Sequence, residues 1–123
     1  MKILVTGSRL WTDRALIKEA LIACTPTIVV HGGYVGADMI ANAVAQGDLH
    51  IAKVRIIQPD HLFARQHTPA EPIDQCLAFP LPKSRGTWDM ITRCVNAGIP
   101  VEVFGNADDD TRYRTLVRKF ATR

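Results

Sequence analysis

Short apolar runs alternate along the chain with segments of helical periodicity, a pattern typical of an α/β protein. The first run, Ile3–Val5, ends at a Thr-Gly-Ser turn and predicts a parallel strand covered on both faces. Apolar residues then recur at helical spacing and predict a helix over about residues 13 to 24. The same reasoning predicts strands at 27–31, 54–57, 76–79 and 101–104, and helices at 37–45 and 87–97.

Two further segments, residues 59–72 and the chain from Asp108 onward, lie outside this series of strands and helices. Residues 59–72 carry three prolines without clean periodicity and are predicted to be irregular. A last helix is predicted from Asp108 onward, with an apolar stripe that includes Leu116 and Phe120. Strands and helices at this spacing connect by right-handed crossovers, so we expect a single Rossmann-like, three-layer domain over residues 1–123 with an open, mainly parallel five-stranded sheet.

Composition fits one ordinary domain. The chain has 123 residues, of which 47% are hydrophobic and 22% charged, enough for one packed core. No apolar run approaches the ~18 residues of a membrane span, and the start is too brief for a signal peptide, so we expect a cytoplasmic protein without membrane contact. Three cysteines without a C-x-x-C pair predict reduced, buried thiols: Cys24, Cys76 and Cys94.

The charge balance adds one alternative. Lys and Arg exceed Asp and Glu by 15 to 12, a mild bias toward anionic partners. Residues 111–123 contain five basic and no acidic residues, which could contact single-stranded nucleic acid. The same charges also complement the dipole of a solvated helix, and we favour that interpretation.

Three strand-to-helix turns have unusual composition: 6–9, 31–38 and 83–87. Ligands of open α/β sheets bind at such turns, where glycine lets a ligand approach the main chain and the first helix amides are free donors. The combination predicts one shared site for an anionic group. Its predicted contacts are Gly7, Ser8, Arg9, His31, Gly32, Gly33, Gly36, Ala37, Asp38, Lys83, Ser84, Arg85, Gly86 and Thr87.

Several side chains have two interpretations. His31 either contacts a phosphate or ribose or only caps its strand, and Asp38 either accepts from ribose hydroxyls or only complements the helix dipole. Trp11 and Trp88 could stack on a base, but we expect both to wedge against the sheet. We predict no metal and no cofactor, because no zinc template fits the candidate ligands, which are His61, His67, Cys76 and Asp60.

The segments TGSRLWTD, VVHGGYVGAD and SRGTWDM, in this order, resemble the SLOG superfamily of Rossmann-like nucleotide-binding proteins, in particular its small YspA-like branch. The superfamily also includes phosphoribohydrolases that activate cytokinins and DNA-processing proteins of natural transformation. The resemblance extends from Lys2 to about Phe104. It implies a nucleotide-derived ligand across the glycine turns, and by analogy a homodimer.

The chain departs from the phosphoribohydrolase pattern P-G-G-x-G-T-x-x-E. Lys83 and Ser84 replace the glycine pair, and Met90 stands at the glutamate position. Asp89, one residue earlier, and Arg65, in the irregular segment, are the remaining catalytic candidates. These losses weaken hydrolysis more than binding, because phosphate capture needs only amides and positive charge. We therefore expect a nucleotide-binding or sensor protein, with cleavage of a nucleoside monophosphate as the alternative.

Overall fold

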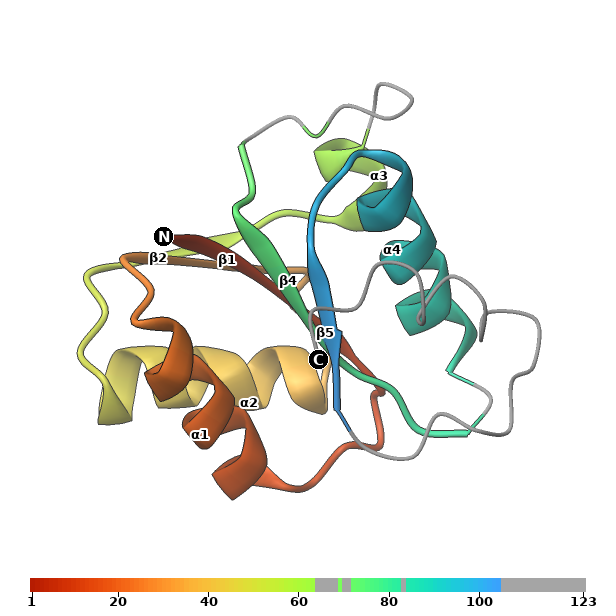
Figure 1. Cartoon of the computed structure of the whole chain (residues 1–123). Helices are drawn as coiled ribbons and strands as arrows, with labels where there is room; N and C mark the ends of the chain where they lie inside the picture. The colour runs from red at the N-terminus through yellow and green to blue at the C-terminus, as the bar shows by residue number, and fades with distance from the viewer. Residues whose placement is uncertain (64–68, 70–71, 83, 105–123) are drawn as a thin grey trace.

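The computed structural model describes residues 1–63, 69, 72–82 and 84–104, and it is an α/β domain built on one sheet of five parallel strands (Figure 1). The strand order is β3-β2-β1-β4-β5, as in a Rossmann-like fold. The predicted fold class is confirmed. The elements are β1 (Lys2–Gly7), α1 (Arg14–Cys24), β2 (Ile28–His31), α2 (Ala37–Ala43), η1 (Val44–Asp48), β3 (Lys53–Ile56), α3 (Pro59–Leu62), β4 (Gln75–Phe79), α4 (Arg85–Asn96) and β5 (Val101–Val103).

Strand β1 occupies the centre of the sheet. It pairs with β2 through Ile3↔Val29 and with β4 through Val5↔Leu77. Side chains alternate along β1, so that Ile3 and Val5 face one layer of helices and Leu4 faces the other. All three are buried, which explains the continuous apolar run in the sequence.

Helices cover both faces of the sheet (Figure 1). Helices α1 and α2 pack on one face through Ile17, Leu21 and Ala41. Helices α3 and α4 pack on the other, where Leu62 and Ile91 belong to a second buried cluster. The two helical layers are therefore separated by the sheet, and each has its own core.

Two elements differ from the sequence prediction. The second helix does not end near Ala45 but continues as a π-helix, η1, in which the Leu49 amide donates to the Val44 carbonyl at 2.9 Å. The segment 59–72 is not irregular throughout, because a single helical turn, α3, begins with Pro59 at its first position. One turn is too short to show periodicity in a sequence. The last predicted helix, from Asp108, lies outside the described residues.

The burial of the cysteines and tryptophans can be compared with the prediction. Cys76 and Cys94 are buried free thiols as predicted, whereas Cys24 is only partly buried because it lies at the end of α1. Trp11 and Trp88 are 6% and 1% exposed, which confirms the packing interpretation. Within the described ranges, no helix is both long and apolar enough to cross a membrane.

Candidate functional site

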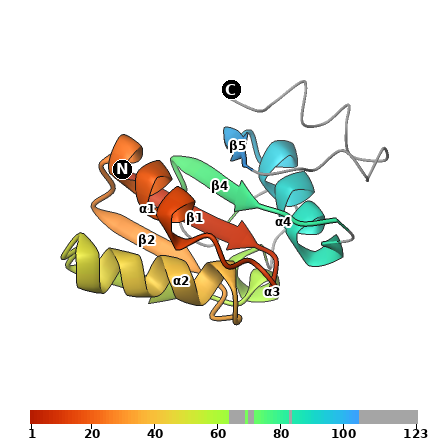
Figure 2. The ribbon, with the colours of Figure 1, turned by 90° about the horizontal axis from the view of Figure 1, so that it is seen from below.

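A cavity of about 720 Å³ lies at the carboxyl end of β1. Its walls come from β1 and the turn that follows, from the turn after β2, from the segment after β3, and from α4 with the turn before it. The order of the sheet reverses between β1 and β4, and the chain leaves these two strands toward opposite faces. Figure 2 shows the arrowheads of β1 and β4 pointing to the same side, from which α4 starts. The cavity thus occupies the place where ligands bind in open α/β sheets.

The start of α4 forms one wall and lacks a side-chain cap. Ser84 stands at the N-cap position, but its Oγ accepts from the Leu81 amide at 2.9 Å and bonds no helix amide. The next three amides, those of Arg85, Gly86 and Thr87, have no acceptor among the described residues. Free amides at the positive end of a helix dipole favour an anion.

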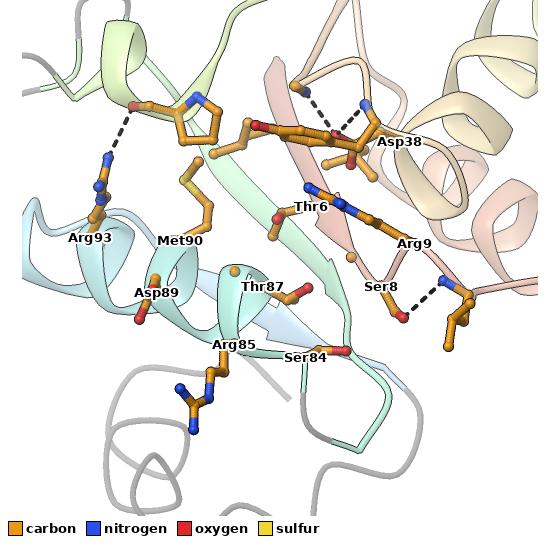
Figure 3. A pocket seen from close by; sticks show the side chains of 18 of the residues that line it. Thr6, Ser8, Arg9, Asp38, Ser84, Arg85, Thr87, Asp89, Met90 and Arg93 are labelled. Carbon is orange, nitrogen blue, oxygen red and sulfur yellow. Dashed lines mark hydrogen bonds between the residues drawn. The ribbon is translucent and has the colours of Figure 1, made fainter.

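Hydroxyl groups line the same space. Thr6 of β1 and Thr87 of α4 are 9% and 4% exposed, and both lie in the middle of the cavity view (Figure 3). Neither hydroxyl has a hydrogen-bond partner within the described part of the chain. Ser8 Oγ accepts from the Leu10 amide at 3.0 Å, which leaves its proton available to a ligand.

Four amides of the turn after β2 have acceptors inside the protein and are not free donors, contrary to the prediction. Asp38 Oδ2 accepts from the amides of Gly32, at 3.0 Å, and Tyr34, at 3.4 Å. The Gly33 amide donates to His31 Nδ1, and the Ala37 amide donates to the Ser8 carbonyl. Among the described residues that line the cavity, only α4 therefore offers three consecutive amides without an acceptor.

His31 lies outside the cavity and is fully buried. Its Nδ1 accepts from Gly33, so its Nε2 carries the proton and donates to Asn42 Oδ1 at 2.9 Å. Both ring nitrogens are used within the fold, and the strand-capping interpretation fits this geometry. A direct contact between the His31 ring and a ligand does not fit this geometry.

Gly36, Ala37 and Gly7 serve the packing of one turn on another. Gly36 has a φ of +82°, and a Cβ there would overlap the carbonyl of Ser8. A Cβ on Gly7 would overlap the Cβ of Ala37. Gly7 lines the cavity, while Gly33, Gly36 and Ala37 do not. Close approach of the backbones, rather than of a ligand, explains these small residues.

A stacked pair closes another side of the cavity. The Arg9 guanidinium lies 4.9 Å from the centre of the Tyr34 ring. The Tyr34 hydroxyl donates to Gln58 Oε1 at 2.8 Å, and Gln58 Nε2 donates to the Gly32 carbonyl at 2.8 Å. Sequence reasoning missed Tyr34. The sequence feature that could have indicated Tyr34 is its place as an aromatic residue between glycines in a strand-to-helix turn.

Asp38 is a buried carboxylate on the cavity wall, 4% exposed. Its Oδ1 has no hydrogen-bond partner within the described residues. Burial raises the pKa of Asp38 to about 6, and the Tyr34 amide, the His31 ring and the Gly32 amide oppose this rise. With this pKa, the Asp38 carboxyl group changes between its neutral and its charged form close to neutral pH.

The catalytic candidates are placed less favourably. Met90, Asp89 and Arg85 all line the cavity, but the side chains of Asp89 and Arg85 extend from α4 away from Thr6, toward its rim (Figure 3). Asp89 therefore does not replace the missing acid in the middle of the cavity. Lys83 and Arg65 lie outside the described residues.

Arg93 was also missed by sequence reasoning. It lines the cavity and donates to the Pro59 carbonyl at 3.1 Å and to Asp60 Oδ1 at 3.1 Å. These bonds hold α3 against α4. Among the residues described, no three His, Cys, Asp or Glu side chains are grouped to hold a metal ion, and His67 is not one of these residues.

Comparisons with known proteins identify a relative in a bacteriophage. No family model matches the chain, and no solved structure matches it. The chain is 35% identical over 127 residues to the Gene 61 protein of Mycobacterium phage D29, in a match that covers 85% of this chain and 97% of the phage protein. The chain belongs to the Gene 61 protein family. The name of the Gene 61 protein states no activity, so a function has to be argued from the cavity.

Proposed function

We propose that this member of the Gene 61 protein family binds a nucleotide or a nucleotide-derived small molecule in the cavity beside β1, with a phosphate at the start of α4. The observation that carries the proposal is the uncapped start of α4, which opens into this cavity. A volume of about 720 Å³ lies within the range of small-molecule sites, roughly 300–1,000 Å³. The resemblance to the SLOG superfamily supports the same ligand class.

The cavity favours binding over turnover. Hydrolysis of a glycosidic bond needs a carboxylate close to the sugar, and Met90 cannot exchange a proton. Asp38 is a carboxylate on the cavity wall, but it lies on the far side of Thr6 from Met90 and so does not occupy the position of the hydrolase glutamate (Figure 3). We therefore propose a binding or sensor protein, without a catalytic step.

Thermal unfolding with a panel of nucleoside phosphates, ADP-ribose, cyclic nucleotides and inorganic phosphate tests this proposal. A ligand at a hundredfold its Kd adds about 2.7 kcal/mol to the stability of the folded state. For a domain of this size we expect the midpoint to rise by several degrees. A panel in which every member leaves the midpoint unchanged at millimolar concentration overturns the proposal.

A matched pair of variants at Gly86 tests whether the phosphate lies at α4. Its amide has no acceptor among the described residues, and a Cβ there meets nothing within 4 Å. Gly86→Pro removes the amide in the first helical turn, where proline is tolerated, and Gly86→Ala adds a Cβ but keeps the amide. We expect nucleotide affinity to fall about 10- to 100-fold in the proline variant relative to alanine, since a bond to a charged group contributes roughly 1.5–3 kcal/mol. Equal affinities would place the phosphate elsewhere.

A further inference from the structure

Asp38 carries an unsatisfied acceptor that the proposed phosphate site does not explain. Its Oδ2 accepts from two backbone amides, while its Oδ1 is buried and has no partner within the described residues. A buried polar atom without a hydrogen bond destabilises the folded protein, and a charged atom does so more strongly. Such an atom is uncommon in a native structure and calls for a partner.

The position of Asp38 relates it to the start of α4. Both lie on the wall of the same cavity. Figure 3 shows Asp38 and Ser84 on opposite sides of this space, with Thr6 and Thr87 between them. A ligand that places its phosphate at the α4 amides extends toward Asp38 at its other end.

The residues that the structure describes offer no partner for Asp38 Oδ1. No ion pair to Asp38 occurs in the described part of the chain, and the Arg9 guanidinium is stacked on Tyr34. No metal-binding cluster is present among the described side chains. A second phosphate is disfavoured near a carboxylate. The partner of Asp38 Oδ1 that these observations favour is therefore an uncharged hydrogen-bond donor on the ligand.

We infer that Asp38 Oδ1 accepts a hydrogen bond from a hydroxyl or amino group at the end of the nucleotide distant from its phosphate. This inference rests on the proposed function and specifies its ligand class: one anionic end and one neutral donor end. Recognition uses a single carboxylate oxygen, because Oδ2 is occupied. A paired contact that needs both oxygens, such as the one that carboxylates make with two adjacent N–H groups, does not fit.

Binding of AMP and three analogues to the full chain tests the inference by calorimetry. The analogues are the 2′-deoxy and 3′-deoxy forms, each without one ribose hydroxyl, and purine riboside 5′-monophosphate, without the amino group. We expect one analogue to bind about 10- to 100-fold more weakly than AMP, as for a lost bond to a charged acceptor. The affected analogue then identifies the donor as a sugar hydroxyl or the base amine.

Asp38→Asn provides the matched protein variant. Its Oδ1 can still accept from Gly32 and Tyr34, but its amide nitrogen replaces the free acceptor by a donor. We expect it to bind AMP about 10- to 100-fold more weakly and to lose the preference for AMP over the affected analogue. Circular dichroism confirms that the variant is folded.

Each result has a defined meaning. Equal affinity of the wild-type protein for AMP and all three analogues overturns the inference but leaves the proposed function standing. The same holds if Asp38→Asn retains AMP affinity and the preference among analogues, or if AMP does not bind while another nucleotide of the panel does. Failure of every nucleotide to bind overturns the proposed function, and the inference with it.

Discussion

Asp38→Asn is expected to make the folded protein more stable near pH 7 and above. Burial raises the pKa of Asp38 to about 6, from an ordinary value of 3.8. Between these two values the unfolded chain releases its proton while the folded chain still holds it. The wild-type free energy of unfolding therefore falls as the pH rises from about 4 to about 7, by up to about 3 kcal/mol from this group alone. Asparagine does not titrate, so the free energy of unfolding of the variant does not fall with pH through this position.

Urea denaturation of both proteins across this pH range measures the effect. The stability difference, variant minus wild type, should grow with pH and level off above about pH 7. Titrating groups that do not interact with Asp38 are present in both proteins and cancel in the difference. A difference that stays constant with pH contradicts the expectation. A stability cost at a proposed binding site is common in proteins.

Gly36→Ala is expected to destabilise the protein by at least about 3 kcal/mol or to prevent folding. Gly36 has a φ of +82° and a ψ of −132°, a conformation that strains an alanine by roughly 1–3 kcal/mol. The added Cβ also overlaps the backbone of Ser8 and Arg9. The two turns would have to move apart, which breaks the bond from the Ala37 amide to the Ser8 carbonyl. Soluble yield and urea denaturation measure the loss.

Gly47→Ala is the matched control. Gly47 lies in η1, has no positive φ, and a Cβ there meets nothing within 4 Å. We expect this variant to be more stable than the wild-type protein by about 0.5–1 kcal/mol, because glycine weakens a helix. If Gly36→Ala were as stable as Gly47→Ala, the close packing of the two turns would be disproved.

The sequence predicted the sheet well because its strands are short apolar runs bounded by turn residues. Ile3–Val5 and residues 76–79 are buried on both faces. Their short length and the turn residues that bound them favoured strands over buried helices. The π-helix was missed, because a shift from four- to five-residue bonding at Val44 leaves no mark in the pattern. Helix α3 was missed because it is a single turn.

The candidate site was predicted in part, from the position of polar and glycine-rich turns after predicted strands. Residues of the first and third turns line the cavity, as expected from their place after strands. The second turn fulfils another role, because Asp38 and His31 bind its amides. Sequence spacing shows that a side chain is near an amide, but not whether the two bond. Thr6 was overlooked, although a polar residue closing an apolar strand is a recognisable signal.

The central position of β1 has a consequence for synthesis on the ribosome. β1 emerges first, yet one of its two neighbours, β4, follows much later: the Lys2 amide donates to Asp74 Oδ2, 72 residues along the chain. Until then one edge of an apolar strand is without its partner, a state that attracts other nascent chains. Chaperone contact during translation should therefore be concentrated on the first strand.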